Sequence, residues 1–338
     1  MVRPGASADL AALLAGRHPG LRVVIVSDAT VAAAMACPID AAEQLTFPAG
    51  ERHKTRASWS QLTDQLVARH CGRDTVLVAL GGGVTSDLVG FVAATYLRGI
   101  PWVAVPTSML AMVDAAIGGK TGVDTDAGKN LVGAVHPPSA VLVDPSLLAS
   151  LPERYYREGL AEAVKHAAIL DAEYGRWLRA NASAIAAREP GVLATLVHRS
   201  LELKAAVVSE DEFEQGRRAI LNAGHTVAHA LEQVTQYGVP HGEAVAIGLV
   251  LETRLAEAAG SCAPGTSQQL AALLAELHLP TELPAGIAAA SVLAAMHTDK
   301  KNRGGVVRAA LLSSFGTTRR DGESWTTPLN LELLRSLL

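Results

Sequence analysis

"TVLVALGGGVTSDLVGFVAATYLRG", residues 75–99, joins an apolar run to a triple glycine and a helix-forming segment. Residues 75–80 have the β-branched, apolar composition of a buried strand. Gly81, Gly82 and Gly83 allow a tight turn, and the helix N-terminus beyond them favours an anionic group. The spacing is not GxGxxG, because Ser86 stands where the third glycine would be. The stretch predicts a strand–turn–helix unit, which is either a plain connection or a phosphate site.

The strand pattern recurs in the first half of the chain, at residues 21–28, 102–107 and 140–144, with helical patterns between several of the runs. This alternation predicts a largely parallel sheet covered by helices. From about residue 153 the pattern changes to successive helices, with breaks at 190–191, 238–242, 264–265 and 280–286. The sequence therefore predicts an α/β domain over residues 1–152 and an all-α domain over residues 153–338.

The composition excludes several classes of protein. Of 338 residues, 49% are hydrophobic and 18% charged, and the formal charge of −4 gives no sign of a surface for nucleic acid or membrane. No apolar run approaches the roughly 18 residues of a transmembrane helix, and charges interrupt the alanine-rich N-terminus, unlike a secretory signal. Cys37, Cys71 and Cys262 lack CxxC spacing. They fit the reduced thiols of a cytoplasmic protein.

Three histidines lie in "LNAGHTVAHALEQVTQYGVPHGEAVA", residues 221–246. If residues 217–232 form one helix, a single face of it carries Arg218, Asn222, His225, His229 and Glu232. A solvated face is the alternative, although lysine and glutamate normally fill such a face. Gly224 inside the helix would cost about 1 kcal/mol relative to alanine, which a close approach by another group would justify.

Two imidazoles need an anionic partner to hold a metal. His225 and His241 supply the imidazoles, and Glu162 on a separate helix supplies a carboxylate. His₂Glu is a known zinc set that leaves a position for water or substrate. His229 would then be available as an acid or base. The competing interpretation is a simple ion pair between Glu162 and Lys165.

Lysines lie in two glycine-rich stretches, an expected loop and a turn. Residues 106–138 combine glycines with Asp114, Lys120, Lys129 and Asn130, and residues 47–54 form a Pro-Ala-Gly turn with Glu51 and Lys54. Backbone N–H groups beside an ammonium favour phosphate, and Glu51 could accept hydrogen bonds from a ribose. Solvated surface charges are the alternative in both places.

Taken together, the motifs resemble the 3-dehydroquinate synthase family of sugar phosphate cyclases over about residues 22–318. The matching stretches are "GGGVTSDLVGFVAATYLRG", "VPTSMLAMVDAAIGGKTGVDTDAGKNLVGA", "LPERYYREGLAEAVKHAAI", "LNAGHTVAHALE", "PHGEAVAIGL" and "DKKNRGG". Long matches in one order are far more specific than a glycine motif. The resemblance implies a Rossmann-like, NAD-binding α/β domain and a helical metal-binding domain.

The resemblance also implies roles for individual residues. Glu162, His225 and His241 match ligands of one divalent metal, zinc or cobalt. Positions that contact NAD match Asp28, Glu51, Lys54, Gly82, Gly83, Val84, Asp87, Thr107, Ser108, Lys129 and Ser150. Substrate positions match Asp114, Lys120, Asn130, Lys165, Lys204, Arg218, Asn222, His229 and one of Lys300 and Lys301. Arg98 matches an arginine that reaches the neighbouring subunit's site in a homodimer. Ser108 and Ser150 stand where threonine is usual.

The implied reaction is that of a carbon–oxygen lyase in the shikimate pathway. Its substrate, 3-deoxy-D-arabino-heptulosonate 7-phosphate, carries a phosphate, a carboxylate and hydroxyls, which explains the many cationic positions. The family oxidises one hydroxyl with NAD, eliminates phosphate, returns the hydride and closes a carbocycle, so NAD is regenerated.

Three alternatives remain from the sequence. Aminodehydroquinate synthase and 2-deoxy-scyllo-inosose synthase are sibling cyclases. A metal-dependent polyol dehydrogenase has the same two-domain plan but would release NADH, and the set Lys120, Asn130 and Arg218 argues against it. A non-catalytic homologue is the third, although every ligand position is filled.

Overall fold

A five-stranded parallel sheet organises the first of two structural units, Met1–Pro152. The computed structural model describes residues 1–39, 42–298 and 306–337. Neighbouring strands follow the order β2-β1-β3-β4-β7. Their bounds are β1 (Arg22–Asp28), β2 (Glu43–Phe47), β3 (Thr75–Gly81), β4 (Trp102–Pro106) and β7 (Ala140–Val141). The four predicted strands are confirmed, the last being shorter than expected, and β2 is an addition.

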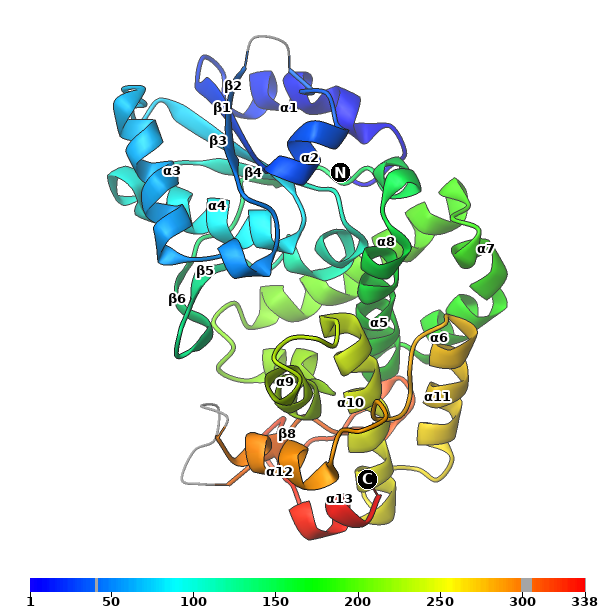
Figure 1. Ribbon diagram of the computed structural model, residues 1–338. Helices are drawn as coiled ribbons and strands as arrows, with labels where there is room; N and C mark the ends of the chain where they lie inside the picture. The colour runs from blue at the N-terminus through cyan, green and yellow to red at the C-terminus, as the bar shows by residue number, and fades with distance from the viewer. Residues whose placement is uncertain (40–41, 299–305, 338) are drawn as a thin grey trace. The chain divides into compact units, whose positions relative to one another are not determined.

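Helices cover both faces of this sheet (Figure 1). Successive strand side chains point to opposite faces, so Leu77 and Ala79 of β3 pack on one side, and Val76 and Val78 on the other. The first face lies under α3 (Arg56–Ala68) and α4 (Gly83–Thr95), and the second under α1 (Leu10–Arg17) and α2 (Ala29–Ala34). Burial on both faces explains the apolar runs at 23–26 in β1, 76–80 in β3 and 102–105 in β4.

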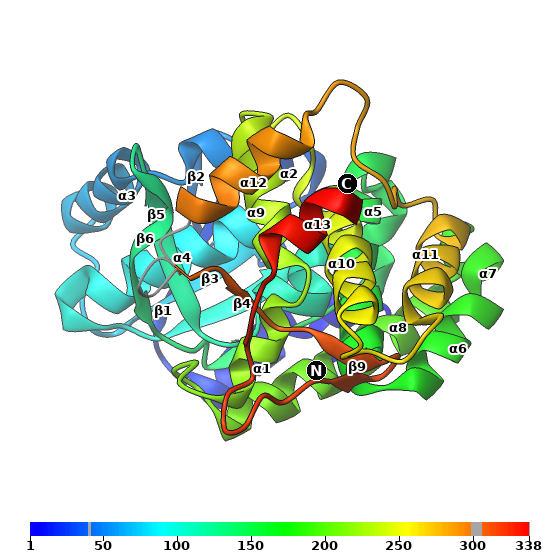
Figure 2. The same cartoon turned by 90° about the horizontal axis from the view of Figure 1, so that it is seen from below.

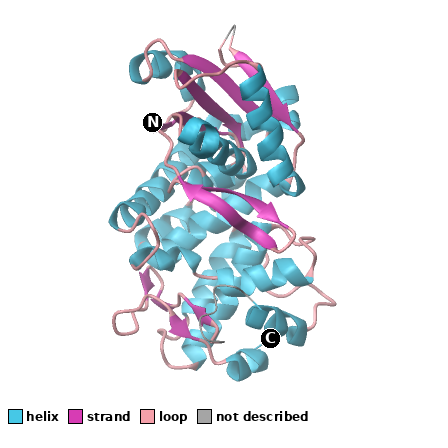
Figure 3. Cartoon of the chain, turned by 90° about the vertical axis from the view of Figure 1, so that its left-hand side faces the viewer, coloured by secondary structure: helices cyan, strands magenta, loops and turns pink. Residues whose placement is uncertain are grey.

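A hairpin occupies much of the segment that was expected to be a glycine-rich loop. The strands β5 (Lys120–Thr125) and β6 (Gly128–Val135) pair antiparallel (Figure 3), and they pack against α4. Gly122 pairs with Gly133, and a Cβ at Gly133 would lie 2.1 Å from the carbonyl oxygen of Thr121. The loop expectation was wrong here because these glycines allow two strands to approach closely. Short turns complete the unit: η1 (Ala6–Asp9), η2 (Glu51–His53), η3 (Tyr96–Arg98), the π-helical η4 (Ala111–Ala115) and η5 (Pro145–Ser150).

The second unit, Glu153–Leu338, is mainly helical. Its helices are α5 (Glu153–Leu170), α6 (Ala172–Ala180), α7 (Ala182–Ala186), α8 (Pro190–Glu210), α9 (His225–Val234), α10 (His241–Ala258), α11 (Thr266–Glu276), α12 (Ala289–Thr298) and α13 (Leu331–Leu337), with the 3₁₀ turn η6 (Arg217–Asn222). Most of α10 is buried, and it packs against α5, α9, α11 and α13 (Figure 2). The central helix of this unit therefore touches both other helices that carry predicted metal ligands.

The second unit also contains short strands, which the sequence did not predict. The antiparallel pairs are β9 (Leu312–Ser314) with β10 (Thr317–Thr318), and β8 (Arg308–Ala309) with β11 (Thr327–Pro328). Strands of two or three residues are too short to give a periodic pattern. Among the described residues, none of the helices has the length and hydropathy needed to cross a membrane.

Candidate functional site

Three of the predicted NAD residues lie at the carboxyl ends of neighbouring strands in the first unit. β1 leads to β2 on one side and β3 leads to β4 on the other, so the chain order reverses between β1 and β3. Ligands of open parallel sheets bind outside the carboxyl ends of the strands at such a reversal. Asp28 ends β1, Gly82 follows β3, and Thr107 follows β4. The sheet topology thus favours the same edge that these predicted residues mark.

The turn after β3 packs closely against the segment after β4. Gly82 is the N-cap of α4, and a Cβ on it would lie 3.2 Å from Ser108 Oγ. The backbone N–H of Thr107 donates to the carbonyl of Gly81 at 2.9 Å. The half-buried Val84 packs against the core of the sheet. This open helix N-terminus is suited to an anionic group.

Lys54 is the centre of a charged cluster in this unit. Its side chain is only 4% exposed, and Nζ donates to Asp87 Oδ2 at 3.1 Å and to Asn130 Oδ1 at 2.8 Å. The carboxylates of Glu51 and Asp124 lie 3.2 and 3.7 Å from Nζ. Burial lowers the pKa of Lys54, but Asp87, Glu51 and Asp124 outweigh it and raise the pKa above its usual value. The ammonium therefore stays charged and fixes its neighbours.

One ammonium cannot neutralise three carboxylates. Burial raises the pKa of Asp87 to about 6, although Lys54 opposes the shift. The folded protein thus binds a proton at Asp87 more tightly than the unfolded chain does. By linkage, this carboxyl makes the fold less stable as the pH rises from about 4 to about 6.

The Asp87→Asn variant lacks this titration. The free energy of unfolding of the unsubstituted protein, minus that of the variant, should therefore be larger at about pH 5 than at about pH 7.5. Urea unfolding of both proteins at the two pH values measures the difference. A difference that does not change with pH would contradict the assignment.

Asn130 has a defined amide orientation. It adopts a left-handed backbone with φ of 53°, and its N–H donates to Asp124 Oδ1 at 2.8 Å. Because the Lys54 ammonium can only donate, Oδ1 of Asn130 must accept. The amide NH₂ is thereby left to act as the donor toward a ligand. Asp124 was not predicted, since its role depends on the hairpin that brings it beside Lys54.

Other candidates of the first unit are less closely grouped. Asp28 Oδ1 caps α2 by accepting from two backbone N–H groups, and Lys129 Nζ lies 3.7 Å from Glu51 Oε1. Ser150 is exposed at the end of η5. Asp114 lies in the π-helical turn η4, and Lys120 is exposed at the start of β5.

The second unit brings the predicted metal ligands together. One ligand atom each from Glu162, His225 and His241 forms a group whose atoms all lie within 4.8 Å of one another. Glu162 Oε1 is 3.7 Å from His225 Nε2 and 3.4 Å from His241 Nε2. Glu162 on α5 is 1% exposed and also forms an ion pair with Lys165. Both sequence interpretations of Glu162, ligand group and ion pair, thus occur in one place.

The rings are oriented by groups behind them. His225 Nδ1 is 3.1 Å from the carbonyl oxygen of Ala223, and His241 Nδ1 is 3.4 Å from Glu232 Oε2. A histidine that ligates a metal normally donates its other N–H to a carbonyl or carboxylate. Both Nε2 atoms therefore face Glu162 and would offer their lone pairs to a divalent metal, so the residues fit such an ion.

The surroundings of His225 and His241 shift their pKa values in opposite directions. Burial and then the Lys165 ammonium hold the pKa of His225 well below its usual value. Burial also lowers the pKa of His241, but hydrogen bonds to Glu162 and Glu232 outweigh it and raise the pKa to about 10. His225 is thus poised as a neutral ligand, while His241 competes for a proton.

The expected continuous helix over residues 217–232 was wrong. The 3₁₀ turn η6 ends at Asn222, and α9 starts at His225 after Gly224, whose φ is 78°. Histidine spacing alone could not reveal the break. The expectation that Gly224 permits a close approach is confirmed, since a Cβ on it would lie 2.8 Å from the backbone nitrogen of Leu249.

Two of the remaining substrate candidates, Arg218 and Asn222, bond to the loop after α8. The side chain of Arg218 donates to the carbonyl of Glu212, and Asn222 donates to the carboxylate of Glu214. Lys204 is buried on α8, which packs against η6. His229 lies edge-on to His225 with ring centroids 5.5 Å apart. Lys300 and Lys301 fall outside the described residues.

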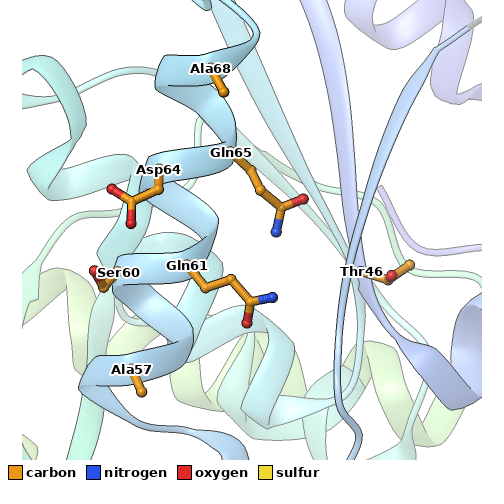
Figure 4. Close-up of a pocket in the computed structure, with 7 residues that line it drawn as sticks. All are labelled: Thr46, Ala57, Ser60, Gln61, Asp64, Gln65 and Ala68. Atoms are coloured by element: carbon orange, nitrogen blue, oxygen red, sulfur yellow. The ribbon is translucent and has the colours of Figure 1, made fainter.

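A hollow of about 860 Å³ lies elsewhere in the first unit (Figure 4). It lies beside α3 and Thr46 of β2, and Gln61 and Gln65 point toward Thr46. Its lining has one charged residue, Asp64. It therefore lacks the cations that a phosphorylated ligand needs.

Comparison with known proteins identifies relatives over most of the chain. The 3-dehydroquinate synthase N-terminal family matches residues 44–158, and the 3-dehydroquinate synthase C-terminal family matches residues 159–302. The 3-dehydroquinate synthase of Xanthomonas campestris pv. campestris (strain 8004) is 44% identical over 303 residues, 85% of this chain and 82% of that protein. That of Xylella fastidiosa (strain 9a5c) is 44% identical over 294 residues, 82% of this chain and 74% of its own length.

Solved structures extend the similarity to the fold. A 2-deoxy-scyllo-inosose synthase complexed with carbaglucose-6-phosphate, NAD⁺ and Co²⁺ is 26% identical, with a TM-score of 0.89 over 99% of this chain and 94% of that one. The 2-epi-5-epi-valiolone synthase of Streptomyces hygroscopicus subsp. jinggangensis 5008, with NAD⁺ and Zn²⁺ bound, is 29% identical with a TM-score of 0.87 and the same coverage.

A probable glycerol dehydrogenase from Sinorhizobium meliloti 1021 has a TM-score of 0.66 at 20% identity, covering 99% of this chain and 93% of that one, and shares the fold alone. The two family matches and the sequence relatives cover most of the stretches on which the predicted resemblance rests. The chain belongs to the 3-dehydroquinate synthase family of enzymes.

Proposed function

We propose that this protein converts 3-deoxy-D-arabino-heptulosonate 7-phosphate to 3-dehydroquinate and phosphate. The single observation that carries the proposal is the convergence of Glu162, His225 and His241, with a supporting group behind each imidazole. The 44% identity to 3-dehydroquinate synthases supports this substrate over those of the sibling cyclases.

The proposal assigns NAD to the first unit and one divalent metal, zinc or cobalt, to the second. When bound, these groups would supply a hydride acceptor and a Lewis acid for substrate hydroxyls. Glu162, His225 and His241 would hold the metal. The NAD assignment is supported by the carboxyl edge of the sheet, where Gly82 opens α4 beside Ser108.

In the proposal, side chains of each unit would bind and orient the substrate. Lys165 lies beside the ligand carboxylate, and Arg218 is held by the loop after α8. These cations suit the carboxylate and phosphate of the substrate. His229 lies next to His225, where it would hold or pass the proton of a substrate hydroxyl. Asn130 would donate through its amide NH₂, because Lys54 occupies its oxygen.

The proposal includes a cytoplasmic homodimer. Arg98 is exposed in the turn after α4, and both it and Leu97 have left-handed backbones, with φ of 65° and 50°. The α4 helix ends at Thr95, and Arg98 lies in the short turn η3 that follows it. Strained backbone conformations of this kind cluster at functional sites, which supports a role for Arg98 in a neighbour's site.

Free Cys37, Cys71 and Cys262 suit a reducing compartment.

The reaction stoichiometry tests the proposal. With the heptulosonate phosphate, the metal and a trace of NAD, each phosphate released should match one dehydroquinate formed, with no net NADH. The physical reason is that NAD, when bound, would serve as a hydride carrier that is not consumed, so no NADH would accumulate. Phosphate release, dehydroquinate and NADH absorbance are followed together.

Two outcomes would contradict the assignment. Continuous NADH formation would indicate a polyol dehydrogenase. Turnover of an aldohexose 6-phosphate in place of the heptulosonate phosphate would indicate a sibling cyclase.

A further inference from the structure

Glu252 of α10 caps the helix that begins with a metal-ligand candidate. Its side chain is buried, at 2% exposure. Oε2 accepts from the backbone N–H of Gly224 at 2.7 Å, and Oε1 accepts from that of Val227 at 3.1 Å. These two amides flank His225, the first residue of α9. One carboxylate thus fixes the backbone on both sides of the histidine.

A single peptide group connects Glu252 to the imidazole. The N–H of Gly224 donates to Glu252, and the carbonyl of the same peptide, that of Ala223, lies 3.1 Å from His225 Nδ1. A peptide group is planar, so its N–H and carbonyl must turn together. The carboxylate therefore sets the direction of the carbonyl that holds the Nδ1 proton and leaves Nε2 as the lone pair.

The backbone at Gly224 needs a hydrogen-bond partner to fix its conformation. Gly224 has φ of 78°, and glycine populates both signs of φ with similar ease. A Cβ at Gly248 would lie 2.0 Å from the carbonyl oxygen of Gly224. Gly248 and Glu252 are one turn apart on the same face of α10. On this face of α10, Gly248 leaves room for the N-terminus of α9, and the Glu252 carboxylate holds that N-terminus in place.

Given the metal site proposed above, we infer that Glu252 is a positioning residue for His225. It acts through the Ala223–Gly224 peptide, which orients the ring and selects the tautomer with Nε2 free for the metal. Supporting groups of this kind typically contribute 10–100-fold to metal affinity.

The Glu252→Gln variant tests the inference with little change of shape. An amide has one acceptor oxygen, and its NH₂ only donates, so one of the two backbone N–H groups would lose the oxygen that it now faces. The metal-free variant should bind Co²⁺ about 10–100-fold more weakly than the unsubstituted protein. The visible absorption bands of the bound Co²⁺ should shift as the ligand geometry changes. Binding of unchanged affinity and an unchanged spectrum would overturn the inference.

Glu257→Gln is the matched control. Glu257 also lies on α10, and it accepts from Ser267 N at 2.8 Å and Ser267 Oγ at 2.5 Å at the start of α11. No metal-ligand candidate lies on α11. Its loss should leave Co²⁺ affinity within about twofold, since the backbone that it holds carries no metal-ligand candidate. A loss equal to that of Glu252→Gln would mean that α10 capping acts only through general stability.

The His225→Ala variant separates the two levels of the proposal. If it binds Co²⁺ as tightly as the unsubstituted protein, the proposed metal site fails. If it binds weakly and Glu252→Gln binds normally, only the inference fails. Should Glu252→Gln not fold, Glu252→Asp replaces it, because it keeps both acceptors but withdraws them by one methylene. A loss of at least about threefold is then expected, and an unchanged affinity overturns the inference.

Discussion

The His241→Ala variant should bind zinc or cobalt more than about 100-fold more weakly than the unsubstituted protein, beyond the usual loss for a supporting residue. His241 Nε2 is 3.4 Å from Glu162 Oε1, and Glu232 holds its Nδ1 from behind. Removing the ring leaves one imidazole and one carboxylate. Two ligands hold divalent zinc poorly, since catalytic sites use three. Metal content after dialysis, and competition with a chromophoric chelator, measure the loss.

His229→Ala is the matched comparison for this prediction. The His229 ring lies 5.5 Å from that of His225, but it is not a member of the group formed by Glu162, His225 and His241. This variant should therefore keep its metal while losing turnover. Equal metal content in His241→Ala and the unsubstituted protein would remove His241 from the ligand set.

Reconstitution adds an independent arm. Chelator-treated protein should lose activity and regain it with zinc or cobalt. The His241→Ala variant should not regain activity at the metal concentration that restores the unsubstituted protein. Recovery of both to the same level would contradict the assignment of His241.

The central strands were predictable because burial on both faces leaves an unbroken apolar run. Residues 23–26 and 76–80 are all hydrophobic for this reason. β2, "EQLTF", lies at the sheet edge with alternating burial and mixed composition, so it escaped notice. The hairpin of β5 and β6 was missed because its glycines resemble those of a loop. These glycines are explained by the close approach of β5 and β6, which becomes visible only once the two strands are paired.

The grouping of Glu162, His225 and His241 was predictable because few other roles suit two histidines and a glutamate among apolar residues. Their geometry was not, because it depends on contacts between helices. The break at Gly224 follows from its fit against Gly248 and the cap from Glu252, which lies 28 residues away. Helical spacing within residues 217–232 carries no trace of either contact. The orienting carbonyl of Ala223 belongs to the backbone and leaves no sequence signal at all.

Arg98 and Lys120 lead to the second large effect. Arg98 is exposed beyond α4, and Lys120 is exposed at the start of β5. In the proposed homodimer, Arg98 serves the neighbour's phosphate and Lys120 serves its own subunit's substrate. Loss of either charge partner should lower kcat/KM on the order of 100-fold or more. The Arg98→Ala and Lys120→Ala homodimers should each be nearly inactive.

Mixing the two inactive variants should restore activity if Arg98 acts across subunits. Random reassociation after unfolding makes about half of the dimers mixed, as for any closed two-fold assembly. In a mixed dimer, one site carries both defects and the other carries neither. With independent sites, about a quarter of the unsubstituted activity should return. Mixing Arg98→Ala with itself is the control for refolding and should return none. If subunit exchange is verified with a tagged chain and activity still does not return, Arg98 serves its own chain, because only an arginine supplied by the partner allows two broken subunits to build one intact site.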